Sequence, residues 1–121
     1  MPCSVLIVDD HPEFRTQVRA LLVAAGYDVV GEAADGESGV RVAMDSRPDV
    51  ILLDVQLPDI TGFEVARRVN RATDPPVIVL ISTRDAADYG SRIRGSGAVG
   101  FISKAELSAR ALGLVLSGVP R

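Results

Sequence analysis

The chain has 121 residues, of which 47% are hydrophobic and 24% charged, and its formal net charge at pH 7 is −3. This length predicts one domain with a single core, and the mild negative charge argues against non-specific binding to nucleic acid or anionic membranes. The one cysteine, Cys3, cannot form an internal disulfide, and no apolar run approaches the roughly 18 residues that span a bilayer, so a cytoplasmic protein is expected.

Five short apolar runs alternate along the chain with more polar segments. The runs are predicted to be strands at residues 5–8, 27–33, 50–54, 77–82 and 99–103. The segments that follow them are predicted to be helices at residues 12–25, 35–44, 62–71, 85–94 and 106–116. The fourth helix is the weakest prediction because of two glycines, Gly90 within it and Gly95 directly after it. This alternation with short loops predicts an α/β domain with a parallel sheet and right-handed crossovers.

Charged and hydroxyl side chains follow the predicted strands. Asp9 and Asp10 end the first strand, Asp54 ends the third, Ser82 ends the fourth, and Lys104, the only lysine, follows the fifth. In a doubly wound sheet these strand ends line one crevice. Three carboxylates gathered there repel one another unless a cation joins them, and oxygen ligands suit Mg²⁺, whereas zinc would need a His/Cys set that this chain lacks. A lysine and a hydroxyl opposite them can hold a phosphoryl group, so the set predicts phosphate transfer onto a carboxylate.

Each of these residues has an ordinary structural interpretation when taken alone. The two N-terminal carboxylates can cap the first helix, and Asp54 can cap the loop after its strand. Ser82 can be a simple strand-end hydroxyl, and Lys104 a solvated surface residue. Their joint occurrence at matching strand ends favours a functional site.

Five motifs contain these residues or lie close to them in the sequence: VDDHP at residues 8–12, DVILLD at 49–54, LPDITG at 57–62, IS at 81–82 and GFISK at 100–104. Together they resemble the receiver domain of two-component response regulators, and the resemblance covers nearly the whole chain. It implies a single doubly wound, flavodoxin-like sheet of five parallel strands in the order 2-1-3-4-5 with five helices. Residues 1–121 are then one receiver domain.

The resemblance also implies a chemistry for the strand-end residues. Asp54 would be the phosphoacceptor, attacking the phosphohistidine of a sensor histidine kinase. Asp9 and Asp10 would hold Mg²⁺ together with Asp54 and the backbone carbonyl of Gln56, and Lys104 would bind the phosphoryl group. Such a domain catalyses only its own Mg²⁺-dependent phosphorylation and dephosphorylation.

Two further residues match the positions that switch in this family. Ser82 would be the switch hydroxyl and Phe101 the switch aromatic, although plain core packing explains Phe101 equally well. Phosphorylation adds roughly −1.5 to −2 charge and three acceptor oxygens. Ser82 and Lys104 can follow this charge inward, and the face formed by the fourth helix, the fifth strand and the fifth helix would then change.

The chain departs from the commonest family pattern at Ala105, where many members have proline. With His11-Pro12 after the acidic pair, this variation resembles the receivers that usually precede a helix-turn-helix DNA-binding domain. Residues 1–121 contain no such domain, so we expect either a stand-alone receiver that controls a downstream effector or a receiver from a longer regulator. Phosphorylation-dependent homodimerisation is a further expectation. Dephosphorylation is expected to be tuned by Gln56 and by Thr83 and Arg84, which follow Ser82.

Two other functions compete with this interpretation. A phosphatase or phosphomutase can also form an aspartyl phosphate, but such enzymes typically need a second aspartate two residues after the nucleophile, where this chain has Gln56. A binding module that works without phosphorylation remains the third alternative. The sequence GSGAVG at 95–100 fits a Gly-x-Gly-x-x-Gly pattern, but it precedes a predicted strand instead of following one, so a dinucleotide site is rejected.

Overall fold

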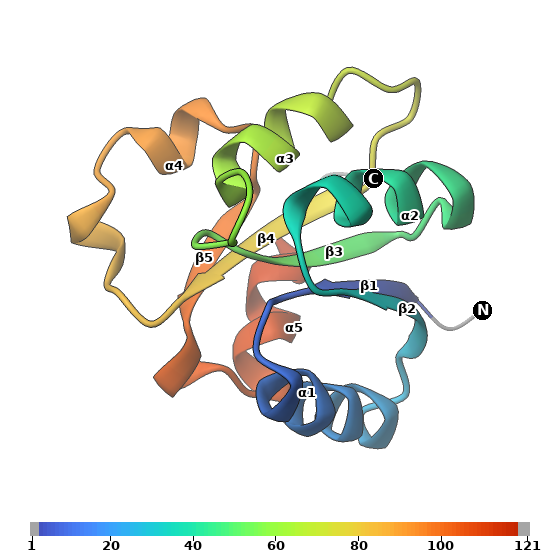
Figure 1. The fold of residues 1–121 in the computed structure, drawn as a ribbon. Helices are drawn as coiled ribbons and strands as arrows, with labels where there is room; N and C mark the ends of the chain where they lie inside the picture. The colour runs from blue at the N-terminus through green and yellow to red at the C-terminus, as the bar shows by residue number, and fades with distance from the viewer. Residues whose placement is uncertain (1–2, 119–121) are drawn as a thin grey trace.

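The computed structural model describes residues 3–118, which form one parallel sheet with helices on both faces. The five strands are β1 (Ser4–Val8), β2 (Asp28–Ala33), β3 (Val50–Asp54), β4 (Val77–Ser82) and β5 (Gly100–Ser103). They are ordered β2-β1-β3-β4-β5, and every neighbouring pair is parallel (Figure 1). The predicted α/β class and strand order are therefore confirmed.

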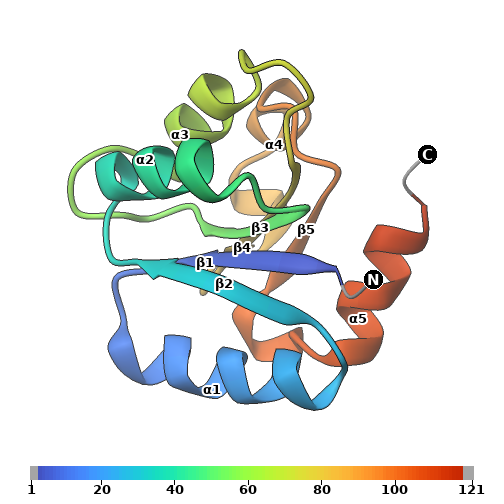
Figure 2. The same cartoon turned by 90° about the vertical axis from the view of Figure 1, so that its right-hand side faces the viewer.

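The five α-helices are divided between the two faces of the sheet. They are α1 (Pro12–Ala24), α2 (Gly36–Ser46), α3 (Gly62–Val69), α4 (Arg92–Gly95) and α5 (Ala109–Ser117), with short 3-10 turns η1 (Ala86–Asp88) and η2 (Lys104–Glu106). Turning the molecule shows α1 and α5 on one face and α2, α3 and α4 on the other (Figure 2). Each face is covered, which is the arrangement that parallel strands require.

The central strands are buried on both sides, because alternate residues enter two separate cores. Leu6, Ile51 and Leu53 pack in the core under α2 and α3. Ile7 and Leu52 point the other way, into the core over α1 and α5. A one-residue slip of either strand would exchange the two sets of side chains between the cores, so the register is fixed. The strand ends are thereby held at defined places along one edge.

The predicted helix over residues 85–94 is wrong, and the structure has a broken segment in its place. The 3-10 turn η1 is followed by a turn at Gly90, with φ of +56°, and then by the short helix α4. Tyr89 is buried while its neighbours are exposed, so one inward-facing side chain and a left-handed glycine interrupt the helix.

The predicted fifth helix also begins later than expected. Residues Lys104–Glu106 form η2, Leu107 is extended, and α5 starts at Ala109. Ser108 sets this start because its side chain accepts a hydrogen bond of 3.0 Å from the N–H of Ala111. The third helix ends at Val69, two residues before the predicted end at Arg71.

We expect Gly62→Ala to destabilise the domain. A Cβ at Gly62 would overlap the backbone carbonyl of Asp54 and lie 2.9 Å from Val55 Cα, so the loop after β3 has to shift. The expected loss is about 1–3 kcal/mol in the free energy of unfolding, measured by urea denaturation. The matched control is Gly113→Ala in α5, where a Cβ meets nothing within 4 Å. That substitution should stabilise the domain by about 0.5–1 kcal/mol, and equal effects of the two would contradict the clash.

Candidate functional site

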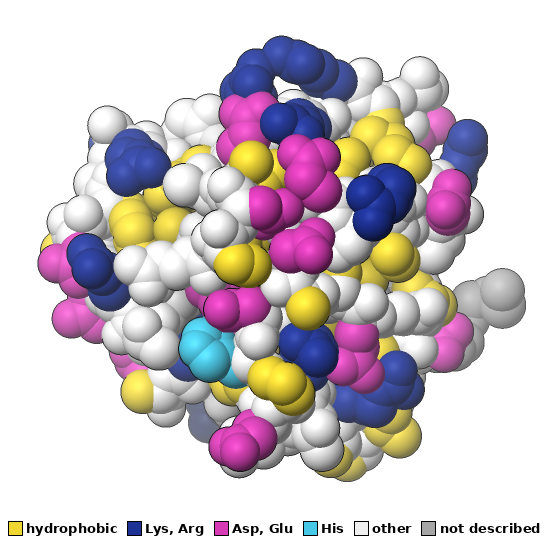
Figure 3. Space-filling model, viewed as in Figure 1, with side chains coloured by type: hydrophobic (Ala, Val, Ile, Leu, Met, Phe, Trp, Pro, Cys, Tyr) yellow, Lys and Arg dark blue, Asp and Glu magenta, His cyan; other side chains and the backbone are white. Residues whose placement is uncertain are grey.

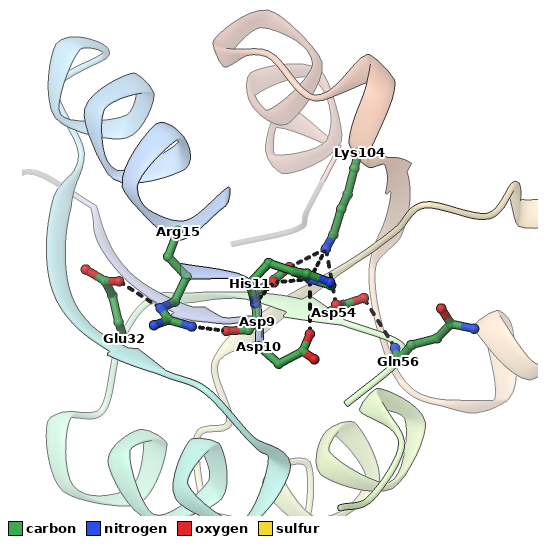
Figure 4. A network of polar contacts seen from close by, with 8 residues as sticks. All are labelled: Asp9, Asp10, His11, Arg15, Glu32, Asp54, Gln56 and Lys104. Atoms are coloured by element: carbon green, nitrogen blue, oxygen red, sulfur yellow. Dashed lines mark hydrogen bonds and ion pairs between the residues drawn. The ribbon is translucent and has the colours of Figure 1, made fainter. Parts of the chain in front are cut away.

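The carboxyl ends of β1, β3 and β5 bring three charged side chains into contact. The Lys104 ammonium lies 2.6 Å from Asp9 Oδ2 and 3.2 Å from Asp54 Oδ2 (Figure 4). Asp9 is fully buried and Asp54 is 2% exposed. These side chains come from positions far apart in the sequence, and the order of the strands alone places them together.

Asp10 and His11 complete a cluster of four potential metal ligands. One ligand atom from each of Asp9, Asp10, His11 and Asp54 lies within 4.8 Å of the other three. His11 Nδ1 is 3.0 Å from an Asp9 oxygen and 3.1 Å from an Asp10 oxygen. Asp9 Oδ2 and Asp10 Oδ1 are buried and receive no hydrogen bond of good geometry from the described residues, although Lys104 and His11 lie nearby. Oxygen ligands with unfilled lone pairs fit a hard cation such as Mg²⁺.

The electrostatics of the cluster are unfavourable for the charge on Asp54. Burial is the largest cause that raises the pKa of Asp54, to about 6, and the neighbouring Asp9 carboxylate adds to this effect. The Lys104 ammonium and the Gln56 N–H, which donates to Asp54 Oδ1 over 3.2 Å, lower it again. The site therefore keeps a carboxylate that is poorly solvated and only partly compensated.

Neighbouring residues fix Asp9 of the cluster, and Lys104 beside the cluster, in place. Arg15 donates to the carbonyl oxygen of Asp9 over 2.5 Å and also binds Glu32, with its Nε 3.0 Å from that carboxylate. Lys104 Nζ lies 4.4 Å from the centre of the Phe14 ring, a cation–π contact that holds the ammonium over the cluster.

The loop after Asp54 is anchored by Asp59. Its carboxylate accepts hydrogen bonds of 2.7 and 2.8 Å from the backbone N–H groups of Gly36 and Glu37 at the start of α2. Burial is the largest single effect on the pKa of Asp59 and raises it, but these donors and the neighbouring backbone N–H groups together outweigh burial and bring the pKa to about 2. This loop contains Gln56, so the anchor fixes the backbone next to the acidic cluster. On this side of the molecule acidic side chains form a band above the single histidine (Figure 3).

Ser82 lies outside the carboxylate network. Its hydroxyl is fully buried and lies 2.7 Å from the Tyr89 hydroxyl, and it accepts a hydrogen bond of 3.1 Å from the N–H of Arg84. No hydrogen bond joins Ser82 to Asp54 or Lys104 within the described residues 3–118. Phe101 packs beside Tyr89, with ring centres 5.8 Å apart.

Tyr89 is the residue that the sequence prediction missed. A continuous helix was expected there, and an inward-facing side chain was not. The only signal was a lone aromatic residue in a stretch from Thr83 to Gly95 that, apart from Ile93, otherwise has only charged and small residues.

Comparisons with known proteins agree with the fold and show the family. The family model of the response regulator receiver domain matches residues 5–113. A putative transcriptional regulator of Pseudomonas aeruginosa is 38% identical over 103 residues, which are 85% of this chain and 50% of that protein. The Bordetella pertussis virulence regulator BvgA is 34% identical, over 85% of this chain and 49% of its own.

Solved structures give the same result. The receiver domain of the putative response regulator NarL from Mycobacterium tuberculosis has a TM-score of 0.83 and 34% identity, and 98% of each chain is covered. A LuxR-family two-component response regulator from Aurantimonas has a TM-score of 0.86 and 28% identity, over 98% of this chain and 87% of that one.

Fold, site and comparisons together define a signalling domain of the two-component systems. The chain belongs to the response regulator receiver domain family, whose general function is to be phosphorylated on an aspartate by a kinase, with Mg²⁺ bound at an acidic pocket. The chain spans about half the length of the curated relatives that it matches. None of the helices in the described part of the chain has the length and hydropathy needed to cross a membrane.

We expect Asp54→Asn to stabilise the metal-free domain above pH 6. The pKa of Asp54 is about 6 in the folded state and about 3.9 when unfolded, so its contribution to stability is full below pH 4 and is lost as the pH rises through 6. Asparagine removes this loss, and the gain at pH 7.5 should be about 1–3 kcal/mol.

Urea denaturation in the presence of EDTA measures this difference across pH 4–8. The matched control is Asp45→Asn, the same charge change on the exposed surface of α2. Added Mg²⁺ in place of EDTA should reduce the difference in unfolding free energy between Asp54→Asn and the wild type, because a cation offsets the repulsion between the carboxylates. A gain in the Asp54 variant that is the same at every pH would contradict the electrostatic explanation.

Proposed function

We propose that this domain is phosphorylated on Asp54 by the phosphohistidine of a sensor histidine kinase. The observation that carries the proposal is the buried Asp54 carboxylate at the end of β3, with Asp9 on one side and the Lys104 ammonium 3.2 Å away. An Asp54 oxygen attacks phosphorus, a P–O bond forms, the P–N bond breaks, and the leaving imidazole takes up a proton. Burial raises the free energy of the ground-state carboxylate, which favours its reaction.

Mg²⁺ is the cofactor that suits the cluster. Asp9, Asp10 and Asp54 would hold it with the backbone carbonyl of Gln56, and its charge would neutralise the oxygens of the group in transfer. Support for this comes from the two buried carboxylate oxygens that receive no hydrogen bond of good geometry from the described residues. His11 Nδ1, 3.0 and 3.1 Å from Asp9 and Asp10, would give way to the ion, and its side chain is exposed enough to move.

Lys104 and Ser82 would bind the phosphoryl group once it is on Asp54. Lys104 already bridges the two buried carboxylates, and its ammonium can follow the new charge with a small movement. Ser82 has one proton to donate, from the adjacent end of β4. Movement of Ser82 toward the phosphoryl group would open space for Phe101, the proposed switch aromatic.

The output is proposed to act through α4, β5 and α5. The relatives are named as transcriptional regulators, and the matched residues make up only about half of each relative, so the domain would control a DNA-binding domain or a separate effector. We assign residues 1–121 to a single receiver domain that binds neither nucleic acid nor membranes itself. It would catalyse only its own phosphorylation and dephosphorylation, and it would homodimerise when phosphorylated.

Intact mass spectrometry tests the acceptor. After incubation with Mg²⁺ and acetyl phosphate, the wild-type chain should gain a single, base-labile addition of about 80 Da. Asp54→Asn should gain none, because its amide is no nucleophile, whereas Asp45→Asn should be modified as the wild type is. A folded wild-type chain that stays unmodified, or an Asp54→Asn chain that is still modified, would overturn the proposal.

The metal site is tested by titration calorimetry with Mg²⁺. Asp9→Asn and Asp10→Asn each remove one negative oxygen ligand, so each should lower the affinity by about tenfold or more. Asp45→Asn serves again as the control and should bind as tightly as the wild type. Unchanged affinity in both Asp9→Asn and Asp10→Asn would place the ion elsewhere.

A further inference from the structure

The Tyr89 side chain has no part in the chemistry proposed above, yet it contacts the Ser82 hydroxyl directly. Tyr89 is the only buried residue between Thr83 and Gly95, all of which the structure describes. Its hydroxyl lies 2.7 Å from Ser82 Oγ, and both residues are buried. A buried hydroxyl that loses its partner costs free energy, so a change at Ser82 has a consequence at Tyr89.

Tyr89 is also held by the elements around it. Its ring packs against Phe63 of α3 and Phe101 of β5, with ring centres 5.4 and 5.8 Å away. The carbonyl oxygen of Tyr89 accepts a hydrogen bond of 3.2 Å from the N–H of Arg92, the first residue of α4. The Arg92 guanidinium in turn lies 4.5 Å over the Phe63 ring. A shift of the tyrosine ring therefore changes the packing of α4.

Ser82 has a single hydroxyl proton, and this couples the Ser82–Tyr89 contact to the phosphorylation site. A serine hydroxyl donates one hydrogen bond and accepts two. The Arg84 N–H fills one acceptor position, so the unphosphorylated pair can form with either hydroxyl as the donor. When Ser82 donates its proton to a phosphoryl oxygen, it has none left for Tyr89. Tyr89 must then donate to Ser82, or the contact breaks.

Phe101 cannot take this part, because it has no hydroxyl. The chain has two tyrosines, and the other, Tyr27, precedes β2 and packs in the core on the α1 and α5 side of the sheet. Of the two tyrosines, Tyr89 is therefore the one whose hydroxyl contacts Ser82.

We propose that Tyr89 transmits the phosphorylation state of Asp54 from Ser82 to the segment Ala86–Gly95. This inference rests on the proposed function of Asp54 and adds to it the route by which the signal leaves the site. Phosphorylation draws the Ser82 proton to the phosphoryl group, so the Ser82–Tyr89 contact is either restricted to Tyr89 as the donor or broken, and the tyrosine ring moves with α4. The segment is suited to respond, since it consists of a 3-10 turn, a left-handed glycine and a helix of four residues.

Tyr89→Phe is the direct test, because it removes only the hydroxyl. The amide resonances of residues 86–95 are recorded by NMR on the full chain, before and after phosphorylation with Mg²⁺ and acetyl phosphate, and intact mass gives the modified fraction. The wild type should show clear shifts in this segment. In Tyr89→Phe these shifts, scaled to the modified fraction, should fall by at least twofold. Tyr27→Phe is the matched control and should respond as the wild type does.

A second measurement covers the case in which Tyr89→Phe does not fold. In Tyr27→Phe, Tyr89 is the only tyrosine, and its ¹³Cζ resonance reports whether its hydroxyl donates a hydrogen bond. This resonance should move on phosphorylation, and the movement should be lost when Ser82→Ala is added. Full-sized amide shifts in Tyr89→Phe, or a ¹³Cζ resonance that does not move, would overturn the inference. A wild-type chain that is not phosphorylated would overturn the proposed function instead.

Discussion

The contact on which the site depends is the one between Lys104 and two buried carboxylates. Asp9 and Asp54 lie at the ends of neighbouring strands, where burial and mutual repulsion both oppose their charges. Lys104 sits 2.6 and 3.2 Å from them and supplies the compensating charge. A buried ion pair of this kind contributes little to stability once desolvation is counted. Its presence is better explained by what the carboxylates can bind than by what they contribute to folding.

The sheet is what makes this arrangement structurally possible. The central strands β1 and β3 are buried on both faces, and their register cannot slip without exchanging the side chains of two cores. The strand ends are consequently rigid. The Asp59 carboxylate accepts hydrogen bonds from the start of α2, and Arg15 donates one to the Asp9 carbonyl. These contacts hold the loops beside the strand ends in fixed positions. Charge can therefore be concentrated at this edge without the backbone moving to relieve it.

Sequence patterns predicted the parts of the molecule in which local preference and tertiary packing agree. The apolar runs indicated the strands, and the polar residues at their ends were enough to predict that Asp9, Asp54 and Lys104 lie together. The prediction failed over residues 85–94, because Tyr89 turns into the core and Gly90 adopts a positive φ. Helical propensity cannot anticipate such a contact, since the Ser82 hydroxyl that Tyr89 meets belongs to the preceding strand.

The segment in which the helix prediction failed, residues 85–94, is the one that must be able to rearrange in the proposed switch. The half of the sheet around β1 and β3 is covered by helices of eleven and thirteen residues, α2 and α1. The segment after β4 has a 3-10 turn and the four-residue α4, with a single buried side chain between Thr83 and Gly95. Few buried contacts mean a small free-energy cost for rearrangement. In the proposed switch, a change of charge at the rigid edge of the sheet would be converted into movement of this weakly packed segment, through the contact between Ser82 and Tyr89.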